Sequence, residues 1–561
     1  MTRGRGFGET ERTIWLLSMP ACAEVISQMK IFTGADGYSE KPHKECTKSR
    51  QQRDHNDTIK LLSYLSKRNP FGKDCKDIVN ISSGKIAHVA SNIDEAKEVG
   101  EKIVATMTGK IVTNVTFKKK DQATHMISPN VVHCEDKAIS IDPLLLFQRL
   151  LTAGEASASK LQEVLSFELA TAPPSLFDSC GMMRVCQKSV LATCLWCTDA
   201  AAETPLLSLH HVFDGGSLLH KINWPKGATY GEIADMYVRF IKSRHPNATI
   251  VFDGYSSNTT TKDSAHIRRA LKSSPDIVVD VNNHLDDTKE SFLSNNNNKQ
   301  SFINILSCKL RLVGVDVYNA KSDADTLIVK HVLESAERVD TVLVGEDTDL
   351  LVLLLHHVKD THNNITFTSF GCRMWNIKKA KSLLGQETSN HLLFLHALTG
   401  CDTTSSPYSI GKKTALAKFK NNLELREASQ IFTASSDIEA IQKAGEKALV
   451  ILYGGSDESL DELRYKKYLR KVVTQKKAVQ PYMLPPTCAA AKHHSLRVYH
   501  QVAVWKSLLD STNEDPTNWG WQLVNNILHP VFTDIAPAPE DLLKIIFCKC
   551  KSDCSSLRCV C

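Results

Sequence analysis

The chain has 561 residues, of which 42% are hydrophobic and 23% are charged, and its formal net charge is +6. This composition is typical of a folded globular protein, and the length allows more than one domain. The charge is too small to indicate a nucleic-acid partner by itself, and apolar runs such as Leu350 to Leu355 are much shorter than the roughly 20 residues that span a bilayer.

Residues 1–200 are predicted to form a mostly helical region of unknown role. Apolar residues recur at helical spacing in NIDEAKEVGEKIVATMTG and in the segment from Asp142 to Leu169. Pro173 and Pro174 interrupt the pattern, and a CLWC sequence follows. Its cysteine spacing is compatible with zinc, whereas the leucine and tryptophan between the thiols favour buried structural cysteines. The opening sequence MTRGRGFGETER does not resemble a secretory signal, so we expect an intracellular protein.

Residues 205–430 are predicted to form an α/β domain, with a parallel sheet flanked by helices. The runs LSLHHVFD, ATIVFD, DIVVDV, VGVDVYNA and DTVLVGED are predicted as buried parallel strands. Helical patterns such as GEIADMYVRFIKSRHP and DADTLIVKHVLESAER lie between them, and the polar stretch SNNNNKQ is predicted as a loop. This alternation of strands and helices is typical of a parallel sheet.

Residues 431–545 are predicted to be helical again and to carry a basic stripe. The stripe comprises Arg464, Lys466, Lys467, Arg470, Lys471, Lys476 and Lys477, with tyrosines among them. Such a stripe suits a phosphate backbone. An ordinary solvated helix face explains it equally well.

Aspartates stand at the ends of the predicted strands or in the turns that follow. They are Asp214 in HHVFD, Asp253 in TIVFDG, Asp323 and Asp325 in SDADT, Asp347 and Asp349 in GEDTD, and Asp402 in LTGCDTT. The carboxyl ends of parallel strands line one crevice, so we expect these acids to converge. Convergence of buried carboxylates is unfavourable unless positive charge offsets it. Hard divalent cations with oxygen ligands provide that charge, and a pair of them can stabilise the attacking and leaving oxygens of a phosphodiester displacement.

Each acid taken singly also has a structural explanation. Asp323 and Asp325 begin a predicted helix, where capping and the helix dipole favour acids. Asp214 and Asp253 precede glycines and suit turns, and Asp402 can cap the next helix. The metal-site hypothesis therefore depends on the order of all seven acids together.

That order resembles the flap endonuclease group of the PIN-like nucleases. The motifs that carry the resemblance are VFDGG, VFDGY, SDADT, GEDTD and GCDTTSSPYSIGKKTA, within residues 205–430. The resemblance implies that the seven aspartates are catalytic residues that hold two Mg²⁺ or Mn²⁺ ions. Asp323 and Asp325 stand where the family has paired glutamates, a departure in side-chain length.

The resemblance also implies residues that contact nucleic acid. SIGKKTALAKF is similar to the glycine-containing turn of the family's helix-two-turn-helix element, with Ser409 where a first glycine is usual. Gly411, Lys412 and Lys413 would then bind the phosphate backbone. Lys262, Arg268 and Arg269 follow Asp253 on a predicted helix, where the family carries basic residues that steer the scissile phosphate. A solvated helix face is the alternative for these three.

The last residues, 548–561, form a cysteine-rich tail, CKCKSDCSSLRCVC. Its thiols are Cys548, Cys550, Cys554, Cys559 and Cys561. Such dense thiols in an intracellular chain are typical of zinc ligands. The tail resembles the beginning of the tesmin-like CXC module, but lacks the module's further cysteines, and a degenerate remnant is the alternative. The wider chain looks like transposon-derived or otherwise uncharacterised animal proteins.

The sequence therefore predicts a metal-dependent structure-specific DNA nuclease with no membrane segment. Its protein partners are unknown, and a nuclear location is inferred from the resemblance and from DNA as the expected substrate. The first alternative is a catalytically inactive DNA- or chromatin-binding protein derived from a transposon. A phosphatase of similar sheet architecture is a weaker alternative, since no phosphate loop or nucleophile motif is evident.

Overall fold

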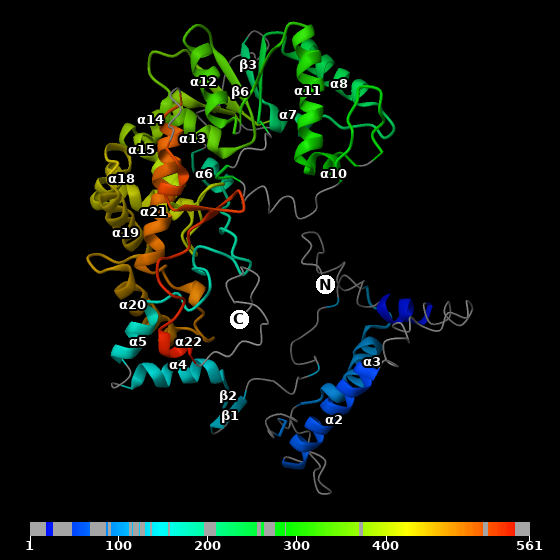
Figure 1. Ribbon diagram of the computed structural model, residues 1–561, viewed down its shortest axis with the longest axis vertical. Coiled ribbons are helices and arrows are strands. Elements are labelled where there is room, and N and C mark those ends of the chain that lie inside the picture. Colours follow the sequence, from blue (N-terminus) through cyan, green and yellow to red (C-terminus); the bar gives the residue numbers. More distant parts are fainter. Residues whose placement is uncertain are drawn as a thin grey trace. The chain divides into compact units, whose positions relative to one another are not determined.

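The computed structural model in Figure 1 describes most of the chain from residue 158 onward and shorter parts before it. The described residues are 18–25, 48–67, 86–87, 91–111, 115, 123, 130–134, 137–154, 158–195, 209–254, 260–262, 275–286, 288–321, 323–369, 374–508 and 514–544. The chain divides into two compact units, Met1–Leu146 and Phe147–Cys561. No helix among the described residues is long and apolar enough to cross a membrane.

The first unit contains helices and one hairpin. Its described helices include α2 (Lys48–Lys67), η1 (Ile93–Glu95) and α3 (Ala96–Met107). Strands β1 (Asn130–Cys134) and β2 (Lys137–Ile141) pair antiparallel. Helix α4 (Pro143–Ala153) follows at the boundary between the units.

The second unit is built around a six-stranded sheet with the order β5-β4-β3-β6-β7-β8. The strands are β3 (His210–Asp214), β4 (Ala248–Phe252), β5 (Asp316–Asn319), β6 (Thr341–Val344), β7 (Ile365–Thr368) and β8 (Met374–Asn376). All neighbours pair in parallel except β8, which runs antiparallel to β7. The α/β prediction, with a mostly parallel sheet flanked by helices, is confirmed.

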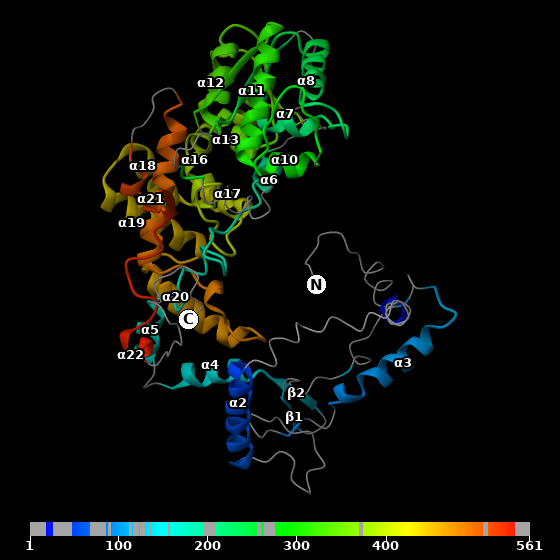
Figure 2. The ribbon, with the colours of Figure 1, turned by 45° about the vertical axis from the view of Figure 1, so that its right-hand side comes forward.

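Side chains of each strand alternate between two hydrophobic cores, one on each face of the sheet. Val212 and Leu343 face one core, which includes α12 (Asp325–Ala336) and α13 (Thr348–His357). Phe213 and Val344 face the other core, which includes α8 (Tyr230–Arg244) and α11 (Asn296–Leu312). Figures 1 and 2 show these two helix pairs on either side of the sheet. Both faces are therefore covered, and the strand ends are left to form the site.

The second unit also contains several shorter helices before α17 (Lys412–Asn421). They are α5 (Ala158–Leu165), α6 (Ser189–Cys194), α7 (Gly215–Lys221), α10 (Lys289–Ser294), α14 (Ile377–Leu384), α15 (Gln386–Asn390) and α16 (Leu392–Leu398).

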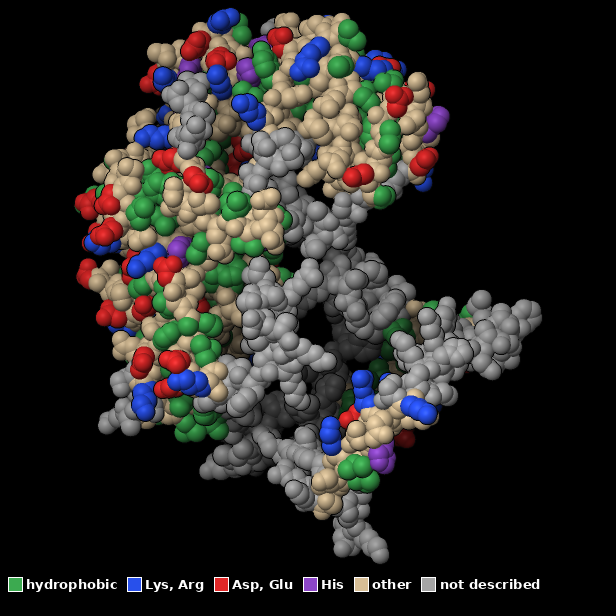
Figure 3. All heavy atoms as spheres, in the orientation of Figure 1, with side chains coloured by type: hydrophobic (Ala, Val, Ile, Leu, Met, Phe, Trp, Pro, Cys, Tyr) green, Lys and Arg blue, Asp and Glu red, His purple; other side chains and the backbone are tan. Residues whose placement is uncertain are grey.

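The described C-terminal part consists of helices and one hairpin. It comprises α17 (Lys412–Asn421), α18 (Leu423–Ala434), α19 (Ile438–Tyr453), α20 (Leu460–Thr474), η7 (Pro481–Met483), α21 (Cys488–Lys506), η8 (Pro516–Asn518), β9 (Trp521–Val524), β10 (Ile527–Pro530) and α22 (Glu540–Leu543). Helix α21 packs against α16 and α19, and most of its side chains are buried. On the face drawn in Figure 3, side chains of both charges are interspersed over this unit.

Two sequence predictions inside the sheet domain were wrong. SNNNNKQ is not a loop, because Asn295 caps α11 by accepting hydrogen bonds from the backbone N–H groups of Asn297 and Asn298. DIVVDV is not a strand, since the Asn298 side chain binds the N–H of Ile277 and the carbonyl of Pro275. These contacts take backbone groups that a strand would need for a neighbour in the sheet.

Candidate metal centre

All seven predicted acids lie at or just beyond the carboxyl ends of β3, β4, β5 and β6, or in the turn after α16. Asp214 ends β3, and Asp253 directly follows β4. The chain reverses its strand order at the β3–β6 pair, because β4 and β5 lie on one side of β3 and β6 lies on the other. Ligands of open α/β sheets bind at such a switch point.

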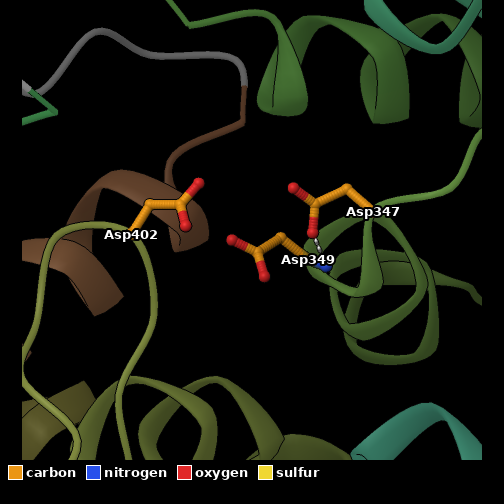
Figure 4. Close-up of side chains that lie close together, drawn as sticks. All are labelled: Asp347, Asp349 and Asp402. Atoms are coloured by element: carbon orange, nitrogen blue, oxygen red, sulfur yellow. Dashed lines mark hydrogen bonds between the residues drawn. The ribbon is translucent and has the colours of Figure 1, made fainter. Parts of the chain in front are cut away.

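Three of the acids form a tight cluster. One ligand oxygen from each of Asp347, Asp349 and Asp402 lies within 4.8 Å of the others. In Figure 4 the three carboxylates, from the start of α13 and from the turn after α16, face one another across a small space. This spacing allows a single cation to contact all three.

The start of α13 fixes the first two acids. Asp347 caps the helix, and its Oδ1 accepts a hydrogen bond of 3.0 Å from the backbone N–H of Asp349. Asp349 lies in the first helical turn, and its side chain is only 1% exposed. The leucine run that follows, Leu350 to Leu355, is fully buried. The apolar run thus anchors α13 in the core and holds the two carboxylates at its amino end.

A lysine and a histidine that sequence reasoning missed contact this cluster. The Lys188 Nζ lies 2.9 Å from Asp349 Oδ2, 2.9 Å from Asp402 Oδ1 and 3.4 Å from Asp347 Oδ1. On the buried side, the His396 Nε2 lies 2.8 Å from Asp349 Oδ1. Neither residue follows a predicted strand or has an acid-rich neighbourhood in the sequence, so no local signal identifies it.

These contacts shift the pKa values of the neighbouring Asp347 and Asp349 in opposite directions. Burial, together with Asp349, raises the pKa of Asp347 to about 7. Burial would also raise the pKa of Asp349, but Lys188 and the hydrogen bond from His396 outweigh it and hold that pKa well below its ordinary value. Burial lowers the pKa of His396 to about 4. The imidazole is therefore neutral near neutral pH, and it supplies Asp349 with a hydrogen bond rather than a charge.

A second acid group has its own lysine. Lys262 Nζ lies 2.6 Å from Asp323 Oδ1 and 3.1 Å from Asp325 Oδ2. Burial, and then the charge of Asp323, raises the pKa of Asp325, while Lys262 opposes this shift. Burial would lower the pKa of Lys262, but the two aspartates, with a contribution from Asp402, raise it well above its ordinary value. The cluster that contains Asp402 and the group around Lys262 therefore interact electrostatically.

Asp214 and Asp253 lie side by side next to the second group. A Cβ added to Gly216 would be 3.2 Å from Asp214 Oδ1 and 3.7 Å from Asp253 Oδ2, so both carboxylates lie close to this glycine. Asp253 Oδ1 accepts a 3.0 Å hydrogen bond from the N–H of Ala324. Asp214 accepts from Gly216 N–H and Ser217 Oγ, and burial raises its pKa.

The predicted phosphate-binding turn contains one residue with a positive φ and one lysine that faces inward. Ser409 has a φ of +65°, the left-handed conformation that glycine adopts most readily. Gly411 precedes α17, and Lys413 is exposed. The Lys412 Nζ is buried and donates to His396 O, Thr399 Oγ1 and Gly400 O. Its ammonium therefore faces the interior, and phosphate binding by Gly411 and Lys413 stays a prediction.

Several other predicted functional residues lie outside the described residues. They are Arg268 and Arg269, and the tail cysteines Cys548, Cys550, Cys554, Cys559 and Cys561. Their roles stay predictions, as does the zinc of the tail. In the basic stripe, Arg464 is fully buried and pairs with Glu168, whereas Lys466 and Arg470 are exposed.

Comparisons with known proteins give a family match in the N-terminal region and structural neighbours elsewhere. A family described as a domain of unknown function (DUF8702) matches residues 1–168, and this match ends before the sheet. No protein with curated annotation matches the chain.

The solved structures similar to this chain include two T5 D15 structures and one of Rad2. A crystal structure of the T5 D15 protein with metal ions is 13% identical, with a TM-score of 0.27, and covers 54% of this chain and 99% of its own. A bacteriophage T5 D15 flap endonuclease in a pseudo-enzyme–product complex with DNA and metal ions is 12% identical, with a TM-score of 0.28 and coverages of 53% and 98%.

The catalytic core of Rad2 in complex with a DNA substrate is 15% identical, with a TM-score of 0.29, and covers 55% of this chain and 95% of its own. TM-scores this low carry no argument about the site. We therefore infer the chemistry of the site from this chain's own residues.

Proposed function

We propose that the sheet domain, residues 205–430, is a divalent-metal-dependent nuclease that hydrolyses phosphodiester bonds in DNA, with flaps or branched ends as the favoured substrates. The observation that carries the proposal is the arrangement of six aspartates at or just beyond the carboxyl ends of parallel strands, with Asp402 from the turn after α16 beside two of them. Asp347, Asp349 and Asp402 have ligand oxygens within 4.8 Å of one another. A set made only of carboxylates suits the hard cations Mg²⁺ and Mn²⁺.

The donor set divides naturally between two ions. Asp347, Asp349 and Asp402 would hold one ion, and Asp323 and Asp325, with Asp214 and Asp253 beside them, would hold the other. Two such ions, when bound, activate a water molecule and stabilise the leaving oxygen of an in-line displacement. This two-metal mechanism requires no covalent enzyme intermediate.

The chain's own residues would keep these ligands in place and balance their charge. His396 orients Asp349 by hydrogen bonding to Oδ1, which leaves Oδ2 directed toward the cluster. The Asp347 cap on α13 and the hydrogen bond from Ala324 N–H to Asp253 restrict two further carboxylates. Lys262, and Arg268 and Arg269 beyond it in the sequence, would attract the phosphate that is cut.

One observation favours a second candidate, a DNA- or chromatin-binding protein without catalysis. Lys188 and Lys262 each neutralise part of the acid cluster, so the carboxylates have counter-charges without a metal. A scaffold of this kind would fold without metal and bind DNA through its basic residues and cysteine tail. A nuclear location and a transposon origin are proposed for either candidate.

Cleavage of end-labelled flap, single-stranded and duplex DNA in Mg²⁺, Mn²⁺ or EDTA tests the proposal. We expect metal-dependent cutting by the wild type and none by Asp347→Asn/Asp349→Asn, while the double variant still binds DNA. The matched control Asp437→Asn removes an exposed helix-capping acid on α19 and should cut normally. A folded wild type that binds DNA but never cuts it would instead support the scaffold.

A further inference from the structure

Lys188 occupies the centre of the acid cluster formed by Asp347, Asp349 and Asp402. We propose that Lys188 is the resident cation of this cluster and that a divalent ion enters only by displacing its ammonium group. Lys188 would thus set the ion concentration at which this half of the site fills. The inference rests on the proposed metal-dependent function and adds a residue that determines when the metal binds.

A segment outside the sheet holds Lys188 in position. Lys188 directly precedes α6, in a segment that lies before the first strand of the sheet in the sequence. Backbone hydrogen bonds of 2.8 Å join this segment to the turn that carries Asp402, from Ser406 N–H to Arg184 O and from Tyr408 N–H to Ser175 O. The Cys186 thiol donates to Gly400 O at 2.9 Å.

These bonds make Lys188 different from a mobile surface lysine. Helix α6 also packs against α13 and α17, the two helices that begin beside the cluster. The Lys188 side chain is only 17% exposed. The backbone beside Lys188 is therefore fixed, and its amine is directed to the carboxylates.

The ammonium and a divalent ion need the same oxygens. Nζ lies 2.9 Å from Asp349 and from Asp402 and 3.4 Å from Asp347, while Mg²⁺ binds oxygen at about 2.0–2.1 Å. An ion bound to all three carboxylates would lie in close contact with the ammonium, and two poorly solvated cations repel strongly at that separation. The flexible four-carbon stem of lysine allows the amine to withdraw when the ion enters.

This competition should lower the apparent metal affinity of the wild type. An ion binds tightly only to the fraction of chains in which the ammonium has withdrawn, so the apparent Kd is raised by the inverse of that fraction. A minor state is commonly populated at about 0.1–10%. Removing the amine should therefore tighten binding at this half of the site on the order of tenfold or more.

The test is Mn²⁺ binding to the full chain, followed by electron paramagnetic resonance of free Mn²⁺ and by calorimetry. The variants are Lys188→Met, Lys188→Arg and the control Lys443→Met, which removes an exposed lysine on α19. We expect Lys188→Met to bind at least about tenfold more tightly, and Lys188→Arg and Lys443→Met to bind no more tightly than the wild type. Equal or weaker binding by Lys188→Met overturns the inference, and so does tighter binding by Lys188→Arg.

Thermal unfolding supplies a readout that is independent of activity. Without Lys188 the three carboxylates repel one another, so Lys188→Met should melt lower than the wild type in EDTA and gain more from added Mn²⁺. A Mn²⁺-dependent rise in Tm no larger than that of the wild type overturns the inference. If neither the wild type nor Lys188→Met binds Mn²⁺, the metal site itself fails and the proposed function fails with it.

Discussion

Replacing His396 by phenylalanine should weaken both the fold and the metal site, because the imidazole holds Asp349 in place. The ring is fully buried, and its Nε2 lies 2.8 Å from Asp349 Oδ1. Loss of a hydrogen bond to a charged group costs about 1.5–3 kcal/mol. The Nδ1 of this ring has no hydrogen-bond partner among the described residues, so its removal recovers on the order of 1 kcal/mol. The net expected loss in the free energy of unfolding is about 0.5–2 kcal/mol.

His494 on α21 offers a matched control for this substitution. It is also fully buried, its Nε2 lies 3.0 Å from the carbonyl of Leu398, and its Nδ1 has no partner in the described part of the chain. Both variants should lose stability in urea unfolding, but only His396→Phe should bind Mn²⁺ more weakly and cleave more slowly at saturating metal. Equal Mn²⁺ affinity in the two variants would refute the positioning role of His396.

Three further predictions test separate parts of the structure. Because the pKa of Asp347 is raised from 3.8 to about 7, its contribution to the free energy of unfolding in EDTA should fall as pH rises from about 4 to about 7 and level off above pH 7. Mn²⁺ affinity should rise over the same range, and Asp347→Asn should flatten the stability change measured in urea at each pH. Ser409→Gly should raise the free energy of unfolding by about 0.5–1 kcal/mol, because glycine adopts the left-handed backbone conformation without strain, whereas Ser409→Ala should give no gain. Equal urea midpoints for Ser409→Gly and the wild type would contradict the presence of strain at Ser409. Arg464→Met should lower the free energy of unfolding by about 3–5 kcal/mol, because it leaves the buried Glu168 carboxylate without its cation. In urea unfolding, the double change Glu168→Gln/Arg464→Met should cost less than the sum of the two single changes.

Four strands of the sheet were predicted because buried strands have a distinctive local pattern, whereas β7 and β8 were not predicted. β3, β4, β5 and β6 each lie inside a predicted apolar run, and the period of two sends alternate side chains into the two cores. DIVVDV has the same local pattern but forms no strand, because its backbone binds the side chain of Asn298. That contact depends on a residue more than a helical turn away in the sequence, so no local pattern shows it.

The acids of the site were predictable for a similar reason, but the groups that hold them were not. Asp214 ends β3, Asp253 directly follows β4 and Asp347 lies three residues after β6, so the topology of a parallel sheet brings them to one edge. His396 and Lys188 belong to elements on opposite sides of these strands in the sequence, and only the folded chain brings both to Asp349.

Lys188 provides a source of positive charge for the acids other than a metal ion. Sequence reasoning required a positive charge to offset the converging carboxylates, and it assigned that charge to metal ions. The fold supplies two of its own cations, Lys188 and Lys262, each within 3.1 Å of two acids. These two lysines offset part of the charge of the acids without a metal, so metal dependence has to be demonstrated as a property of activity. For this reason the comparison of Lys188→Met with the wild type, in EDTA and in Mn²⁺, separates a metal centre from a self-neutralised scaffold.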